Sequence, residues 1–167
     1  MFSLTRKTEY ALIAMWHLAR ADGEVCSARD VAERYGIPVT LLMNVLKTLQ
    51  RKGLVKSTRG ANGGYTLATS ADQVSLERLI ETVEGPFRLV RCADDPRTAA
   101  GDGQSEAHAI DAGPCDLAGT CPIQHPLRRL HERLRRFLAG VTVADLALDD
   151  RYAEITTSYP LQRASVE

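Results

Sequence analysis

The feature that most constrains this 167-residue chain is a pair of predicted helices joined by the short turn Gly36-Ile37-Pro38. Ser27 begins a Ser-x-x-Asp cap with Asp30, which predicts a first helix over 28–35. Proline is favoured at or just before a helix start, so Pro38 predicts the beginning of a second helix. The residues over 39–52 alternate at helical spacing between an apolar face and a polar face. Together these signals predict a helix-turn-helix.

A turn-rich hairpin is expected directly after the second helix. Strand-like runs at 54–58 and 65–68 enclose the segment Arg59-Gly60-Ala61-Asn62-Gly63-Gly64. Before the helix pair, residues 4–20 contain no Gly or Pro and predict a mostly buried helix. The expected fold class is therefore mainly α with a small β-hairpin wing, and residues 1–70 are expected to form a winged helix-turn-helix.

The rest of the chain divides by composition. An amphipathic segment predicts a connecting helix within 71–91. Residues 92–121 are expected to form a cysteine-bearing loop, because 93–114 are rich in Ala, Asp and Gly and poor in large apolar residues. Residues 149–167 show no strong pattern, and we expect a flexible tail there.

A leucine stripe predicts a long C-terminal dimerisation helix within 122–148. The stripe falls at helical spacing over about 126–138, opposite a face rich in arginine. Such a helix needs a partner for its apolar side, and a two-fold copy of itself is the simplest partner. Four leucines are expected to line this homodimer interface: Leu127, Leu130, Leu134 and Leu138.

Charge is distributed unevenly along a chain whose formal net charge is zero. Residues 1–65 carry ten Lys and Arg against five Asp and Glu, a net +5, and the remainder carries eleven against sixteen, a net −5. A basic N-terminal module on an acidic carrier is typical of phosphate binding confined to one face. No apolar run approaches the ~20 residues that span a bilayer and no signal-peptide core is present, so we expect a cytoplasmic protein with no membrane partner.

The polar face of the second helix and the wing tip have the chemistry of a DNA-binding surface. Asn44, like Thr40, suits base edges, Met43 suits a thymine methyl group, and Arg59 suits a narrow minor groove. A solvated surface helix or a protein-interaction module would also have a polar face, but helix, turn, basic excess and Arg-Gly wing agree on double-stranded DNA. Eight residues are expected to contact it, with Lys47 and Arg51 at phosphates: Thr40, Met43, Asn44, Lys47, Arg51, Arg59, Gly60 and Asn62.

No enzyme signature accompanies this surface. The sequence contains no recognisable Ser-His-Asp set, phosphate-binding loop or pair of carboxylates in a pocket-like setting. We therefore expect neither catalysis nor a small-molecule substrate.

Three cysteines lie in or beside the polar loop, at the spacing C-x22-C-x5-C: Cys92, Cys115 and Cys121. Cys26 lies far from them and is expected to be an ordinary small residue. Structural disulfides are disfavoured in a reducing cytosol, so clustered thiols indicate metal or redox chemistry. Thiolate is the soft ligand that iron–sulfur clusters and zinc prefer, and three thiols leave a fourth position for another donor. The spacing matches neither a ferredoxin nor a zinc finger, so a structural zinc site and cluster-free redox-active thiols remain alternatives.

Three segments resemble the family of winged-helix transcriptional regulators that includes IscR and NsrR, which are iron–sulfur cluster regulators. They are Thr5-Arg6-Lys7-Thr8-Glu9-Tyr10-Ala11-Leu12, the helix over 39–52, and Arg59-Gly60-Ala61-Asn62-Gly63-Gly64-Tyr65. The resemblance covers roughly 1–148. It implies a homodimer, held by a long C-terminal helix, that binds an imperfect palindrome in promoter DNA.

The same resemblance implies a 2Fe–2S or 4Fe–4S cluster on Cys92, Cys115 and Cys121, whose loss, oxidation or nitrosylation changes operator affinity. Members usually space these cysteines closely, whereas here 22 residues separate the first two. For the fourth ligand, the resemblance to NsrR-like members favours Glu9, reaching across from the partner subunit. His125 is the alternative, at a position resembling the ligand histidine of IscR-like members, and His17 on the first helix is a weaker candidate.

Overall fold

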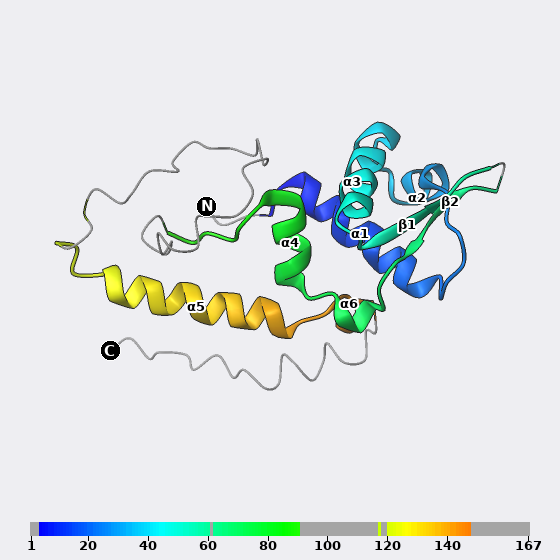
Figure 1. The fold of residues 1–167 in the computed structure, drawn as a ribbon. Coiled ribbons are helices and arrows are strands. Elements are labelled where there is room, and N and C mark those ends of the chain that lie inside the picture. The colour runs from blue at the N-terminus through cyan, green and yellow to red at the C-terminus, as the bar shows by residue number, and fades with distance from the viewer. Residues whose placement is uncertain (1–3, 61, 91–116, 118–119, 148–167) are drawn as a thin grey trace, which may run out of the picture.

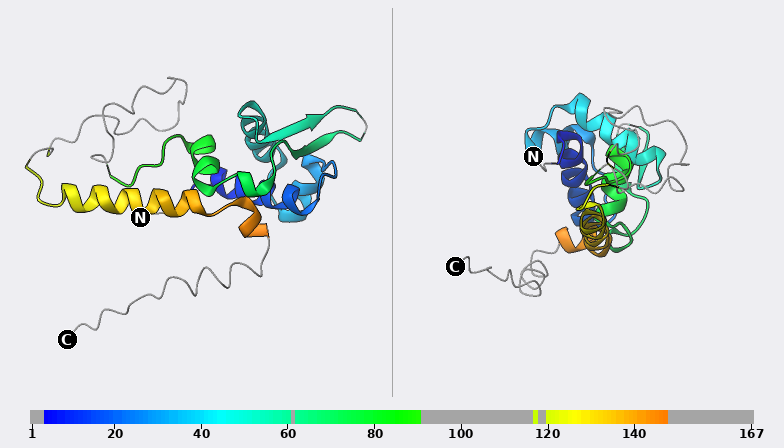
Figure 2. Two further views of the ribbon diagram at one scale, coloured as in Figure 1. Left: turned by 60° about the horizontal axis from the view of Figure 1, so that its bottom comes forward. Right: turned by 90° about the vertical axis from the view of Figure 1, so that its left-hand side faces the viewer.

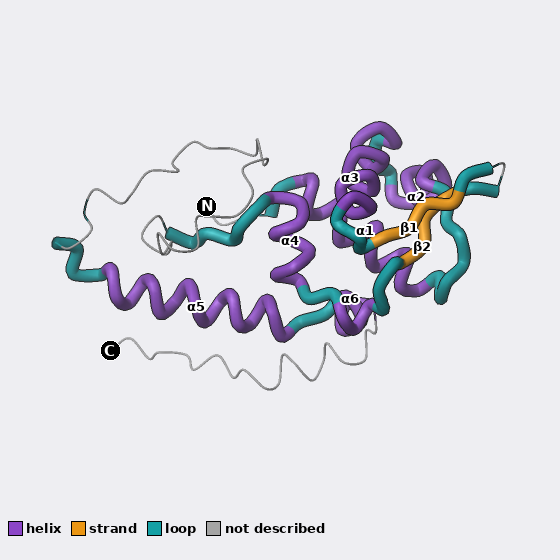
Figure 3. Tube along the Cα trace, viewed as in Figure 1, coloured by secondary structure: helices purple, strands orange, loops and turns teal. Residues whose placement is uncertain are grey.

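The computed structural model describes residues 4–60, 62–90, 117 and 120–147 (Figure 1). Helices dominate these residues, and Figure 3 shows the two strands as a narrow hairpin among them. The expected fold class, mainly α with a β-hairpin wing, is confirmed. The elements in chain order are α1 (Arg6–Arg20), α2 (Ala28–Tyr35), α3 (Val39–Arg51), β1 (Val55–Thr58), β2 (Gly64–Leu67), the 3-10 turn η1 (Ala71–Gln73), α4 (Leu76–Glu84), α5 (Gln124–Gly140) and α6 (Val143–Ala147).

The helix-turn-helix forms where its caps predict. Ser27 precedes α2, and its hydroxyl accepts the Arg29 N–H at 3.2 Å. Gly36 then adopts the left-handed conformation, with φ of 64°, which reverses the chain after α2. Pro38 immediately precedes α3, whose last residue is one short of the expected end. The turn between the helices is therefore set by a glycine and a proline that the sequence alone identifies.

Helix α1 is the centre of the core. It packs against α3, α4, α6 and β2, and it buries Ala11, Ala14, Met15 and Leu18. Helix α3 contributes Leu42, Val45, Leu46 and Leu49 to the same core. Helix α3 therefore rests directly on α1, so a displacement of α1 would also move α3.

The wing is a two-stranded antiparallel hairpin pinned to the α1–α2 connection. Val55 pairs with Leu67 and Thr58 with Gly64. Cys26 forms a bridge with Tyr65, with N–H···O distances of 3.0 and 2.8 Å. A Cβ built on Gly64 would lie 2.3 Å from the Cys26 carbonyl oxygen, so the close approach of these two backbones requires glycine.

The segment expected to be one dimerisation helix over 122–148 contains two helices. Helix α5 ends at Gly140, and Thr142 then forms a β-bridge with Ser75 before α6 begins. The Asp145 carboxylate accepts from both the backbone N–H (2.9 Å) and the hydroxyl (2.7 Å) of Thr142, which caps α6. The break occurs because Val141, Val143 and Ala147 are apolar and buried against the winged helix, whereas a continuous helix would carry them away from it.

Elements α1 to α4, with the wing and with α6 packed on α1, form a compact head. Helix α5 forms an arm beside this head. Figures 1 and 2 show its N-terminal end extending away from the head, opposite the wing. Helix α4 contacts both α3 and α5 and lies between them. Among the described residues, no helix is long and apolar enough to cross a membrane.

Candidate nucleic-acid interface and cluster site

The outer face of α3 carries all five of the helix residues expected to contact DNA. Each of their side chains is exposed: Thr40, Met43, Asn44, Lys47 and Arg51. They project away from the buried side of the same helix, as its 3.6-residue period requires. The structure thus gathers on one surface residues that the sequence placed on one helical face.

Hydrogen bonds join α3 and the turn before it to neighbouring segments. The Ile37 N–H donates to the Ala32 carbonyl of α2 at 2.9 Å, within the turn that leads into α3. The Leu54 N–H donates to the Leu49 carbonyl at 2.9 Å and ties the end of α3 to the segment that follows it. The Gln50 amide donates to the Ser57 hydroxyl at 2.6 Å and joins α3 to β1. Helix α3 thereby presents its exposed side chains in a defined orientation relative to the wing.

The wing tip is shaped by glycine and carries the cation Arg59. Arg59, Gly60 and Asn62 are exposed, and residue 61 lies outside the described residues. The Gly63 N–H donates to the Gly60 carbonyl at 3.0 Å and closes the turn. No acidic side chain pairs with Arg59 or Lys47 in the part of the chain that the structure describes. Both cations are thus free to meet phosphate or the minor groove.

The candidate cluster ligands fall partly outside the described residues. Cys92 and Cys115 are both outside them. Cys121, in the turn before α5, has a free, half-buried thiol. No trio of His, Cys, Asp and Glu side chains gathers as a metal site among residues 4–60, 62–90, 117 and 120–147. The Cys121 thiol suits iron–sulfur or zinc ligation as a soft donor, but the described residues of one chain do not complete a site.

The two proposed fourth ligands lie on different elements. Glu9 is exposed in the first turn of α1, and His125 is exposed in the first turn of α5, four residues after Cys121. Cys121 lies three residues before the start of α5. Figure 1 shows that this end of α5 projects away from the head, to which α1 belongs. Because the two elements are separated within one chain, a Glu9 ligand would have to come from a second subunit.

His17 is engaged elsewhere. Its Nδ1 lies 2.9 Å from the Tyr35 hydroxyl, and the two rings stack edge to face at 5.5 Å between centroids. Burial, followed by the positive charge of Arg34, lowers the pKa of His17. These contacts account for His17 as a packed, hydrogen-bonded histidine of the α1–α2 interface.

Cys26 also has a local role. It bridges to the wing through its backbone, and its thiol donates to the Glu24 carbonyl at 3.7 Å. Burial, followed by the negative charges of Glu24 and Asp30, raises the pKa of the Cys26 thiol. A thiol held protonated is a poor metal ligand, which matches its expected role as an ordinary small residue.

Two groups of contacts that sequence reasoning missed join the segments on either side of the cysteine loop to the rest of the structure. The Glu84 carboxylate at the end of α4 accepts from the Thr8 hydroxyl at 2.6 Å and also from the Thr5 hydroxyl, which ties α4 to the start of α1. Beyond α4, the Phe87 ring stacks on His131 of α5 at 5.6 Å, and His131 Nδ1 accepts the Leu89 N–H at 3.4 Å. His131 is thus a buried polar residue in α5, whereas the sequence analysis identified only leucines on the apolar side of that helix.

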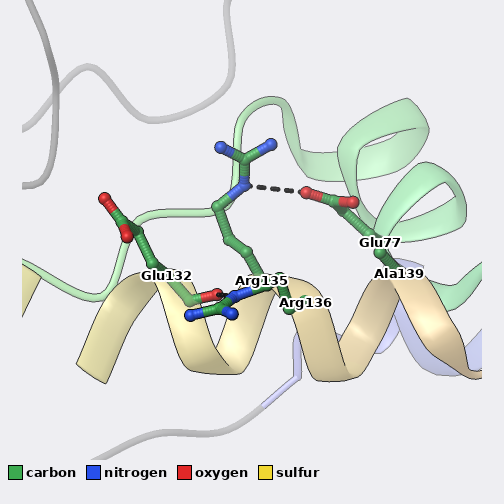
Figure 4. Close-up of a pocket in the computed structure, with 5 residues that line it drawn as sticks. All are labelled: Glu77, Glu132, Arg135, Arg136 and Ala139. Atoms are coloured by element: carbon green, nitrogen blue, oxygen red, sulfur yellow. Dashed lines mark hydrogen bonds and ion pairs between the residues drawn. The ribbon is translucent and has the colours of Figure 1, made fainter. Parts of the chain in front are cut away.

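Helices α4 and α5 are also joined by charge. Arg135 donates to the Glu77 carboxylate at 2.7 Å across a shallow pocket that Glu132, Arg136 and Ala139 also line (Figure 4). Burial, followed by the negative charge of Glu77, raises the pKa of the neighbouring Glu81. Four of the five residues that line this pocket are charged, and the Arg135–Glu77 pair among them links the arm to the head.

The leucine stripe of α5 is only partly covered. Leu130 is 46% exposed and Phe137 is 40% exposed, whereas Leu127 and Leu134 are half-buried. Leu138 is half-buried near the junction with α6. Within the described part of the chain, the structure leaves this apolar face open to a further partner.

Comparison with known proteins places this architecture in a family. A family model described as "Rrf2: Iron-dependent Transcriptional regulator" matches residues 4–149. The chain is 32% identical over 145 residues to the HTH-type transcriptional repressor NsrR of Streptomyces coelicolor, covering 86% of each chain. It is 34% identical over 149 residues to the HTH-type transcriptional regulator slr0846 of Synechocystis, covering 89% of each. These relatives are transcriptional regulators rather than enzymes, as the sequence led us to expect.

Solved structures share the fold. CymR of Bacillus subtilis, described as the global cysteine regulator of that organism, superposes with a TM-score of 0.64 at 24% identity, covering 88% of this chain and 97% of CymR. T. potens IscR superposes with a TM-score of 0.62 at 23% identity, covering 95% of this chain and 97% of that one. The likeness to IscR and NsrR expected from three short segments is confirmed over nearly the whole described chain.

Proposed function

The chain belongs to the Rrf2 family of transcriptional regulators, and we propose that it is a homodimeric, DNA-binding repressor whose operator affinity is controlled by an iron–sulfur cluster. The observation that carries the DNA-binding part is the outer face of α3, where five exposed side chains face away from the core. Beside it is the wing, where Arg59 has no acidic partner among the described residues. The family model covers residues 4–149, and on this proposal the outer face of α3 and the wing contact the DNA.

On this proposal the eight expected residues divide by role. Thr40 and Asn44 contact base edges, and Met43 contacts a thymine methyl group. Lys47 and Arg51 contact phosphates, and Arg59, carried by the turn that includes Gly60 and Asn62, enters the minor groove. The polar contacts of Arg51 support a phosphate role, because its guanidinium donates to the Thr48 hydroxyl at 3.3 Å and is held at the end of α3.

Substitutions in the basic residues test the DNA contacts. Arg59→Ala should weaken binding to a selected operator by roughly 1–3 kcal/mol. Lys47→Ala should weaken binding to all duplexes and reduce the slope of log K against log salt concentration by about one. Arg78→Ala, on an exposed part of α4, is the matched control and should change neither. Equal operator affinity of the wild type and Arg59→Ala would remove the wing from the interface.

The partly exposed stripe on α5 supports the homodimer. Leu127, Leu130, Leu134 and Leu138 would bury against the two-fold mate, and an operator palindrome would then meet two linked heads. Leu130→Glu places a charge in that apolar interface, so sedimentation should detect monomers and operator affinity should fall. Arg129→Glu, on the polar side of the same helix, is the control and should stay dimeric. A dimeric Leu130→Glu protein would assign the interface to another surface.

The family description as iron-dependent and the trio Cys92, Cys115 and Cys121 support an iron–sulfur cluster. Bound there, a cluster would supply chemistry that responds to oxidation, nitric oxide or iron–sulfur status. Protein purified without oxygen should contain iron and sulfide and absorb visible light. Zinc in their place, with no colour, would favour the alternative of a structural zinc site, and absence of all three would favour cluster-free redox-active thiols.

For the fourth ligand we propose Glu9 of the partner subunit. Its exposure at the start of α1 supports this role, because the carboxylate is available to a second chain while α1 packs on α3. Glu9→Ala should shift the visible spectrum or shorten the lifetime of the cluster and leave the dimer intact. Glu33→Ala, another exposed carboxylate, is the control. If His125→Ala changes the spectrum and Glu9→Ala does not, the ligand is His125.

A further inference from the structure

The start of α3 exposes apolar side chains that folding does not explain. Val39 is 36% exposed, Leu41 is 47% exposed and Met43 is 38% exposed, all within five residues. The next apolar residues of the same helix, Val45, Leu46 and Leu49, are buried. Apolar exposure is thus concentrated at the end of α3 that follows the Pro38 turn.

Leu41 in particular lies outside the set of residues that the sequence analysis assigned to DNA. It lies about 100° around the helix from the buried Leu42, and it is not one of the residues that α3 contributes to the hydrophobic core. With 47% of its surface exposed, Leu41 gains only about half of the stabilisation that full burial of a leucine gives to folding. Its presence is explained by something that covers it only in a complex.

The surroundings identify the chemistry of that partner. Thr40, Asn44 and Lys47 lie between the two apolar side chains on the exposed face, and Lys47 and Arg59 carry positive charge with no acidic partner among the described residues. The partner of this surface must accept both cations and small apolar side chains. The DNA major groove meets both needs, because the thymine C5-methyl group is the apolar element among its base edges.

The spacing of the two side chains places them on opposite flanks of the polar stripe. Leu41 and Met43 are two residues apart, hence about 200° apart around the helix, with Thr40 and Asn44 directed between them. A single base pair therefore does not serve both side chains. Each flank meets a different base pair.

Building on the proposed function, we propose that Leu41 is a specificity-determining residue that reads a thymine methyl group on the flank of α3 opposite Met43. Each operator half-site then carries thymines on both sides of the base pairs that Thr40 and Asn44 contact. Val39, in the first turn, closes the apolar contact on the Met43 side.

The experiment removes single methyl groups from DNA. An operator is first selected from random duplexes with the full-length wild-type protein, and each thymine is then replaced, one at a time, by deoxyuridine. Loss of one buried methyl contact should lower affinity about threefold to fivefold at two positions in each half-site. Leu41→Ala should abolish the thymine–uracil difference at one position, and Met43→Ala should abolish it at the other.

Val25→Ala is the matched control, because Val25 is 45% exposed in the same head but outside α3, and it should keep both differences. If Leu41→Ala weakens binding equally to thymine and uracil operators, Leu41 does not read a methyl group and the inference is wrong. Unchanged DNA affinity of Leu41→Ala also overturns it, and points to a protein partner for this face. If no operator is selected at all, the proposed function itself fails.

Discussion

Helix α3 in the head and helix α5 in the arm have nearly the same amphipathic pattern, but neighbouring elements cover their apolar stripes to different extents. In α3 the apolar stripe is fully covered, with Leu42 and Leu49 at 0% exposure. In α5 a stripe of similar spacing leaves Leu130 46% exposed. Periodicity therefore predicts a helix with an apolar face in both cases, but what covers that face depends on the neighbouring elements. In the head α1 covers it, and for the arm we propose a second copy of the chain.

The largest expected effect separates the two stripes directly. Leu42→Ala leaves a cavity beneath the recognition helix and should lower the free energy of unfolding by about 3–4 kcal/mol. Leu130→Ala, measured at a concentration low enough to hold monomers, should lower it by less than about 1 kcal/mol. Denaturant unfolding of both variants gives the comparison. Equal losses in dilute monomer would mean that the arm's stripe is buried within one chain.

Two glycines give the next contrast. Gly64→Ala forces a Cβ against the Cys26 backbone and should cost about 2–3 kcal/mol, because the atoms it meets belong to the main chain of the α1–α2 connection. Gly140→Ala meets nothing within 4 Å at the end of α5. It should be neutral or stabilise the protein by up to about 1 kcal/mol, since alanine favours helix. Thermal unfolding of the pair measures both, and a tolerated Gly64→Ala would mean that the wing moves away from Cys26 at little cost.

The junction between head and arm should give a smaller effect. The Trp16 indole N–H donates to the Leu146 carbonyl at 3.1 Å, and Arg20 donates to the Ala147 carbonyl at 3.2 Å, so α1 holds the end of α6. Trp16→Phe removes one donor and should cost about 1 kcal/mol. Amide hydrogen exchange should become faster in α6 and stay unchanged in α2. Faster exchange in α2 as well would mean that the substitution disturbs the core rather than the junction.

The smallest effect concerns pH and the α1–α2 interface of the head. Because burial and Arg34 lower the pKa of His17 below its ordinary value of about 6.5, the folded state binds fewer protons at this site than the unfolded state does. This contribution to stability is present above pH 6.5 and is lost as pH falls below it. His17→Gln should therefore flatten the decline of the melting temperature between pH 7 and pH 5. Parallel profiles for the variant and the wild type would contradict this assignment.

Local signals predicted the local structure closely. Helix α2 has the expected bounds, because Ser27 and Gly36 cap it with contacts to residues only a few positions away. The wing and the exposed face of α3 followed from turn residues and periodicity in the same way. The cluster site was predictable only as three cysteines and a choice between Glu9 and His125, since no local spacing specifies a ligand that comes from another element.

The sequence by itself determined which segments are helices, where the recognition helix turns its polar face, and which family the chain resembles, because caps, turns and periodicity act within a few residues. The tertiary structure alone decided that the chain breaks after Gly140 so that α6 returns to α1, and that Glu84 is held by Thr5 and Thr8. It also decided that His131 is buried beside Phe87 and that about half of the Leu41 surface stays exposed. These outcomes depend on contacts between residues as many as 130 positions apart, such as Trp16 with Leu146, and no local pattern encodes such a distance.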